Sequence, residues 1–214
     1  MSAVVDDDDV TVRAGWVEPL ASALEQRGVG AAQPKLLIAG SSPQRVNSLG
    51  VAIGRDGAGT DIGDGSLDVV VGSSSVIDRF TGGAVMFAPD FLRETGGFDE
   101  RFFLYYEDAD LGARGAALGW SYALVPMSVV EHEGSATTAT DSGRTRFLQE
   151  RNRLWHAFRH CDGGTQMRAL WLSVRRLRHR PRGVHARALL AGLAGAPLAW
   201  FRRARRENSA GALR

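Results

Sequence analysis

Apolar positions along the chain recur with two different spacings, and together they predict alternating helices and strands. Apolar residues four positions apart, from Trp16 to Leu24, predict a helix over 15–26 that is closed by Gly28 and Gly30. Short apolar runs typical of buried strands lie at 4–5, 33–39, 82–88, 121–125 and 129–132. Further helices are predicted over 89–95, 108–118, 143–160, 165–178 and 184–206. Strands alternating with helices indicate an α/β layered fold.

One long segment, 40–68, lacks either period. It is rich in Gly, Ser and Asp, with turn-forming pairs of the Asp-Gly type. We therefore expect a surface loop there, with a hairpin over 46–54 and a further short strand over 69–71.

Charge divides the chain into two parts. Its 214 residues are 44% hydrophobic and 23% charged, the balance of an ordinary globular protein. Residues 1–143 carry 9 Lys and Arg against 21 Asp and Glu, whereas 144–214 carry 17 Arg against 3 acidic residues. The single cysteine, Cys161, excludes a disulfide framework within the chain. The basic part favours an anionic partner, either a membrane surface or nucleic acid.

Four consecutive aspartates, Asp6 to Asp9, follow the apolar pair at 4–5. Carboxylates at the end of a strand suit Mg²⁺ or Mn²⁺, which prefer oxygen ligands and keep positions open for substrate phosphates. An acidic run is also common on a solvated surface, and the run alone does not separate the two interpretations.

A second acidic group, Glu107, Asp108 and Asp110, directly follows the aromatic-rich segment 102–106. Partial burial raises the pKa of a carboxyl group, and this tunes it as a general base. The alternative is a capped helix, in which the carboxylates satisfy free amides at the first turn. His132 ends an apolar run before a Gly-Ser pair, which suits a metal ligand, a phosphate donor or a structural histidine.

Four segments stand in a characteristic order along residues 4–160. They are VVDDDDVTVRAGWVEPLASALEQ, TGGAVMFAPDFLRETGGFDE, GGFDERFFLYYEDADLGARGAALGW with the following VPMSVVEHEGS, and a helix carrying Glu150-Arg151-Asn152-Arg153. This set resembles the family 2 glycosyltransferases, in their rhamnosyltransferase-like and galactofuranosyltransferase-like branch. The resemblance implies a GT-A fold, that of nucleotide-diphospho-sugar transferases.

The resemblance also implies roles for individual residues. Asp7 and Asp9 fill the DxD positions that would hold a metal on the donor's diphosphate, and His132 fills the position that often completes that site. Asp108 would be the catalytic base, with Glu107 as the other member of the Glu-Asp pair.

Further residues are expected to bind the donor or the acceptor. Gly82 and Gly83 would let the backbone approach a sugar, and Trp16, Asp110 and Arg151 complete this predicted set. The implied reaction is inverting transfer from a nucleotide-sugar donor to a glycan or lipid-linked acceptor in cell-envelope polysaccharide synthesis. A divalent metal, Mn²⁺ or Mg²⁺, would neutralise the leaving diphosphate.

The family normally begins with βα units that bind the nucleotide base and ribose, and no counterpart precedes residue 4. We therefore expect a partial GT-A fold that lacks these N-terminal units, with a C-terminal basic helical segment. The expected domains are 1–160, the transferase part, and 161–214, the basic tail. An inactive truncated remnant or a non-catalytic subunit is the alternative that this absence favours.

The tail, 161–214, combines arginines with an apolar run over 188–201 that ends in Trp200 and Phe201. Basic residues beside an apolar, Trp-bearing helix are typical of a membrane interface. The predicted location is cytoplasmic, peripheral on the inner face of the cytoplasmic membrane. The alternatives are a solvated helix packed on the acidic body and a membrane- or nucleic-acid-binding protein acting through the tail. Because no nucleic-acid recognition fold is visible, nucleic acid is the weaker partner.

Overall fold

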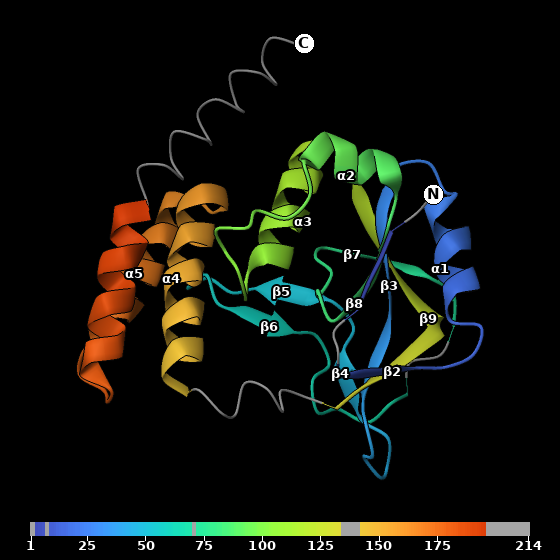
Figure 1. Ribbon diagram of the computed structural model, residues 1–214, viewed down its shortest axis with the longest axis horizontal. Helices are drawn as coiled ribbons and strands as arrows, with labels where there is room; N and C mark the ends of the chain where they lie inside the picture. The colour runs from blue at the N-terminus through green and yellow to red at the C-terminus, as the bar shows by residue number, and fades with distance from the viewer. Residues whose placement is uncertain (1–2, 7–8, 70–71, 134–141, 196–214) are drawn as a thin grey trace. The chain divides into compact units, whose positions relative to one another are not determined.

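The computed structural model describes residues 3–6, 9–69, 72–133 and 142–195 (Figure 1). The chain forms two compact units, and it passes between them several times. Unit 1 comprises Met1–Ala52, Thr60–Glu100 and Glu107–Thr137. Unit 2 comprises Ile53–Gly59, Arg101–Tyr106 and Thr138–Arg214.

A mixed sheet forms the centre of unit 1. Its strands follow the order β1 (Ala3–Asp6), β8 (Ala84–Phe87), β3 (Val29–Ile38), β9 (Ser121–His132) and β2 (Val10–Val12). Strand β3 runs parallel to β9, and all other neighbours are antiparallel. Two short strands extend the sheet, β4 (Val46–Ser48) beside β3 and β7 (Ser75–Ile77) beside β9. A separate ribbon joins β5 (Val51–Ile53) to β6 (Gly59–Asp61).

Helices cover both faces of this sheet. Because side chains alternate along a strand, Ala31 and Ala32 of β3 point to opposite faces. Ala32 packs with α1 (Val17–Leu24), whereas Ala31 packs with α2 (Pro89–Thr95) and α3 (Glu107–Ala117). Figure 1 shows α1 on one side of the strands and α2 with α3 on the other. The α/β layers expected from the sequence are therefore confirmed.

Two glycines differ from their expected roles near α1. Gly30 was predicted to close the first helix, but it lies inside β3. A Cβ at Gly30 would lie 2.5 Å from the Phe91 ring, so its small size lets α2 pack against the sheet. Gly15 has φ +75°, a left-handed conformation that cannot continue a helix, and α1 therefore begins at Val17.

The strand predictions needed further corrections. The two runs at 121–125 and 129–132 form one strand, β9, because a register shift opposite Pro34 and Lys35 accommodates the residues between them. The hairpin predicted over 46–54 does not form, since β4 pairs with β3 and β5 pairs with β6. The predicted strand 69–71 lies largely outside the described residues.

Unit 2 is helical in its described part. It contains α4 (Ser142–His160), α5 (Gly163–Arg176) and a helix over 182–195, and α4 and α5 lie side by side in Figure 1. The Asp162 side chain caps α5 by accepting from the backbone N–H of Thr165 at 3.0 Å. Leu154, Ala157 and Ala169 form its apolar core. Across the described ranges, no helix combines the length and apolar character that crossing a bilayer requires.

Candidate active site

The side chain of Asp108 lies at the first turn of α3, in unit 1. Its Oδ2 accepts a hydrogen bond from the backbone N–H of Gly82 at 2.9 Å, and its Oδ1 accepts from the N–H of Ala109 at 2.6 Å. A helix N-terminus favours a negative charge, because its free N–H groups point outward. The carboxylate is therefore fixed in direction by two backbone donors.

Burial raises the pKa of Asp108 above its ordinary value of 3.8. The N–H groups of Gly82 and Ala109 lower this pKa, and the negative charge of Asp61 raises it. Loss of water around the carboxyl group is the largest of these effects. A fixed carboxylate with an elevated pKa is well suited to accept a proton from a hydroxyl group.

Gly82 provides the close backbone approach to this acidic pair. A Cβ at Gly82 would lie 3.7 Å from both Oδ2 of Asp108 and Oε1 of Glu107, so both predicted carboxylates face this glycine. The next residue, Gly83, is buried. The preceding residue is held by Gln33, whose Oε1 accepts from the N–H of Thr81 at 2.8 Å. The structure thus brings together three of the predicted residues, Gly82, Glu107 and Asp108.

Asp9 and His132 meet where β2 pairs with β9. Val10 lies opposite His132 in the antiparallel register, which places Asp9 beside the end of β9. The Oδ1 of Asp9 lies 3.1 Å from Nε2 of His132. The third predicted metal ligand, Asp7, is outside the described residues.

These two groups fit a divalent metal. A carboxylate oxygen and an imidazole nitrogen are ligands that Mn²⁺ accepts, and two protein ligands leave positions for diphosphate oxygens. No set of three or more His, Cys, Asp or Glu with metal-binding geometry occurs in the part of the chain that the structure describes. The fit therefore rests on the pair Asp9 and His132.

Asp61, at the end of β6, belongs to the same acidic region and was missed by sequence reasoning. Desolvation raises its pKa most strongly; its hydrogen bond with Ser48 lowers it, the negative charge of Asp64 raises it, and His132 lowers it. Since Asp61 also interacts with the charge of Asp108, it connects Asp108 with His132 electrostatically. Its place in a Gly- and Asp-rich segment gave no periodic signal by which it could have been found.

Two predicted donor- or acceptor-binding residues have structural partners in unit 1. Asp110 is buried, and its Oδ2 accepts from Nε of Arg114 at 2.8 Å. Trp16 packs against the core, while its carbonyl oxygen accepts from Oγ of Ser128 at 2.7 Å. Their binding roles stay predictions.

Arg151 lies in unit 2, on α4. Its Nη2 donates to the carbonyl oxygens of Arg101 and Phe102, both at 3.1 Å. Its guanidinium carbon lies 4.3 Å from the centroid of the Trp155 ring, a cation–π contact. Arg151 therefore holds the backbone of a loop in the same unit, and its role in substrate binding stays a prediction.

Comparison with protein families gives a match over nearly the whole chain. A family model described as glycosyl transferase family group 2 matches residues 3–205. Two N-acetylglucosaminyl-diphospho-decaprenol L-rhamnosyltransferases, from Mycobacterium tuberculosis strains CDC 1551 / Oshkosh and ATCC 25618 / H37Rv, are each 46% identical over 48 residues. The aligned residues are 22% of this chain and 16% of each relative.

A solved structure shares the fold. The crystal structure of GalNAc-T7 with UDP, GalNAc and Mn²⁺ superimposes with a TM-score of 0.60 at 12% sequence identity. The match covers 87% of this chain and 38% of that one. The GT-A type of fold implied by the sequence is therefore confirmed.

Proposed function

This chain belongs to glycosyl transferase family group 2, and we propose that it transfers a sugar from a nucleotide-sugar donor to a glycan or lipid-linked acceptor. The observation that carries the proposal is the carboxylate of Asp108, held by two N–H groups and raised in pKa by burial. Both features suit a general base at neutral pH.

The proposed chemistry is a single displacement with inversion. Asp108 takes the proton of an acceptor hydroxyl, and the freed oxygen forms a bond to the anomeric carbon of the donor sugar. The bond between that carbon and the diphosphate oxygen breaks, and the nucleoside diphosphate leaves with the electron pair. The acceptor oxygen attacks the face of the sugar opposite the leaving diphosphate. A single displacement of this kind gives the inverted product, by analogy with inverting glycosidases.

Asp9 and His132 would hold a divalent metal, with Asp7 as the third proposed ligand. The bound metal would supply Lewis-acid stabilisation of the leaving diphosphate. The solved structure of similar fold contains UDP and Mn²⁺, which supports Mn²⁺ as the first ion to test. Mg²⁺ has the same preference for oxygen ligands.

A lipid-linked acceptor is supported by two observations. The rhamnosyltransferase relatives are named for an acceptor on diphospho-decaprenol, a lipid carrier. In unit 2, α5 exposes an apolar stripe that consists of Met167, Trp171 and Val174, and the guanidinium of Arg175 lies 5.3 Å from the centre of the Trp171 ring.

Apolar side chains flanked by cations are suited to an anionic lipid surface. We therefore propose a peripheral position on the inner face of the cytoplasmic membrane, with a role in cell-envelope polysaccharide synthesis. Trp200 and Phe201, which the sequence also assigned to the membrane, lie outside the described residues.

The direct test is a donor screen. The purified chain is incubated with Mn²⁺, N-acetylglucosaminyl-diphospho-decaprenol and a panel of nucleotide sugars, and the lipid is analysed by mass spectrometry. Addition of one sugar from one donor supports the proposal. Binding of a nucleotide sugar without release of nucleoside diphosphate would overturn it in favour of a non-catalytic subunit.

A further inference from the structure

The side-chain amide of Asn152 binds three carbonyl groups of one short loop. Its Nδ2 donates to the carbonyl oxygens of Phe102 and Leu104 at 2.9 Å and of Tyr105 at 2.8 Å. Asn152 is fully buried on α4, and its Oδ1 accepts from Nε of Arg151 at 2.8 Å. Both ends of the amide are therefore engaged, and its two N–H groups serve three loop carbonyls, of which that of Phe102 also accepts from Arg151 and from the N–H of Leu104.

The same loop has an unfavourable backbone conformation. Phe103, Tyr105 and Tyr106 have φ angles of 64°, 68° and 69°, in the left-handed region that favours glycine. Phe103 is also 66% exposed, so burial of its ring does not compensate for the strain. Strained residues of this kind persist only when surrounding contacts hold them, and they gather at functional sites.

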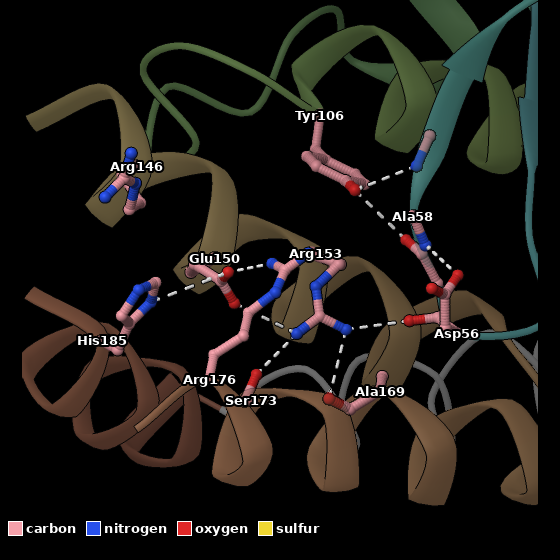
Figure 2. A network of polar contacts seen from close by, with 12 residues as sticks. Asp56, Ala58, Tyr106, Arg146, Glu150, Arg153, Ala169, Ser173, Arg176 and His185 are labelled. Atoms are coloured by element: carbon pink, nitrogen blue, oxygen red, sulfur yellow. Dashed lines mark hydrogen bonds and ion pairs between the residues drawn. The ribbon is translucent and has the colours of Figure 1, made fainter. Parts of the chain in front are cut away.

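Neighbouring side chains of unit 2 tie this loop to the turn over 53–59. The hydroxyl of Tyr106 accepts from the N–H of Gly59 at 3.0 Å and donates to the carbonyl of Gly57 at 3.2 Å. Figure 2 shows this hydroxyl directed at the turn that carries Ala58, with Arg153 reaching the same turn through the carbonyl of Asp56 at 2.8 Å. The consecutive residues Asn152 and Arg153 thus hold two segments of the unit.

Arg153 is itself fixed by several partners. Its Nη2 donates to Oε2 of Glu150 at 3.2 Å and to Oγ of Ser173 at 2.5 Å, and its Nη1 donates to the carbonyl of Ala169 at 3.1 Å. The arginine is buried in this network (Figure 2). The helix that carries Asn152 is therefore anchored to α5, and the loop is held against a rigid support.

The last residue of the strained loop, Tyr106, is joined by one peptide bond to Glu107, the first residue of α3. From this arrangement we infer that Asn152 is a positioning residue for sugar transfer. By fixing the loop in which Phe103, Tyr105 and Tyr106 are left-handed, it restrains the backbone that continues through one peptide bond into Glu107. The expected effect of Asn152 on turnover rests on the proposed transferase activity, whereas its expected effect on the loop does not.

The test replaces Asn152 by aspartate, which has the same shape but presents no donor to the three carbonyls. In the Asn152→Asp variant of the full chain we expect faster hydrogen–deuterium exchange over 101–110. We also expect a kcat about 10²-fold lower with an unchanged donor KM, because a small misplacement of a catalytic group has an effect of that size. The control is Leu154→Ala, which creates a cavity on the same helix and leaves every one of these hydrogen bonds in place.

A rescue experiment separates positioning from general loss of stability. Glycine adopts a left-handed φ without strain. Adding Phe103→Gly to Asn152→Asp should therefore restore slow exchange over 101–110 and raise kcat at least tenfold. Leu104→Gly is the matched control, since Leu104 is exposed and is absent from the residues with positive φ.

Two results would overturn the inference. One is an Asn152→Asp variant whose exchange and kcat match those of Leu154→Ala. The other is rescue by Leu104→Gly equal to that by Phe103→Gly. If the wild-type chain transfers no sugar, the proposed function fails, and the exchange and rescue data over 101–110 still decide whether Asn152 holds the loop.

Discussion

The backbone N–H of Gly82 and the carboxylate of Asp108 are 26 positions apart in the chain and form a 2.9 Å hydrogen bond at the start of α3. The N–H lowers the pKa of Asp108, yet burial raises it by more, so the net shift is upward. The folded protein therefore favours the protonated carboxyl group relative to the unfolded chain. This preference has a measurable effect on stability.

We expect the stability contributed by Asp108 to decrease as pH rises. Below the ordinary value of 3.8, both states are protonated, whereas between 3.8 and the raised pKa the folded state holds more protons than the unfolded state. The free energy of unfolding of the wild type should therefore fall relative to that of Asp108→Asn across this window. The fall is about 1.4 kcal/mol for each unit of pKa shift.

Urea unfolding of both proteins at a series of pH values measures this difference. A difference between wild type and Asp108→Asn that stays constant from pH 3 to pH 8 would contradict the raised pKa of Asp108.

The buried arginine of unit 2 should be important for stability. Replacing Arg153 by methionine removes its ion pair with Glu150, together with its hydrogen bonds to Ser173, Ala169 and Asp56. Of the two arginines that pair with Glu150, Arg176 then remains. Removing one member of a buried pair costs about 3–5 kcal/mol, which we expect as the loss in the free energy of unfolding.

The control for this experiment is Arg178→Met, since Arg178 is exposed. The double variant Glu150→Gln with Arg153→Met should lose less than the sum of the two single variants, because the ion pair between the two side chains is lost in each single variant and only once in the double variant. Additive losses would show that the two side chains do not act as a pair.

The apolar stripe on α5 predicts binding to anionic vesicles. The chain should sediment with phosphatidylglycerol vesicles, and less so with phosphatidylcholine or at high salt, because screening weakens the attraction of arginines to lipid headgroups. Trp171→Ser should weaken binding roughly tenfold, the effect expected for losing one large apolar contact.

Leu118→Ser is the comparison variant, since Leu118 is 56% exposed in unit 1, whereas Trp171 is 62% exposed in unit 2. Equal binding by Trp171→Ser and Leu118→Ser would exclude α5 as the membrane-binding surface. Retention by nucleic acid and not by vesicles would point to the alternative anionic partner.

Sequence periodicity was sufficient to predict the position of helices whose ends carry local capping or breaking residues. Pro89 begins α2 and Gly96, with φ +78°, ends it, so the predicted helix 89–95 is confirmed in full. The helix predicted over 143–160 differs from α4 by one residue. Long-range pairing was not predictable, because the choice between a β4–β5 hairpin and a β3–β4 pair depends on contacts distant in sequence.

The sequence predicted those residues of the candidate site that lie within the motifs resembling the family. The grouping of Gly82 with Glu107 and Asp108, and of Asp9 with His132, agrees with the segments that resemble the family. Asp61 and Asn152 were missed as functional candidates, because their roles depend on where distant segments fold. Asn152 lies within the segment from Glu150 to Arg153 that resembles the family. Its partners are loop carbonyls, however, which have no sequence signature.

The central claim is that Asp108 is the base for sugar transfer, and the most direct measurement compares turnover with donor binding in Asp108→Asn. General-base catalysis is worth about 10²–10⁴-fold, so we predict a loss of kcat in that range with a donor Kd within about threefold of the wild type. Asp90→Asn, a change at an exposed acid on α2, should leave both values unchanged. Retention of wild-type kcat by Asp108→Asn would contradict the account.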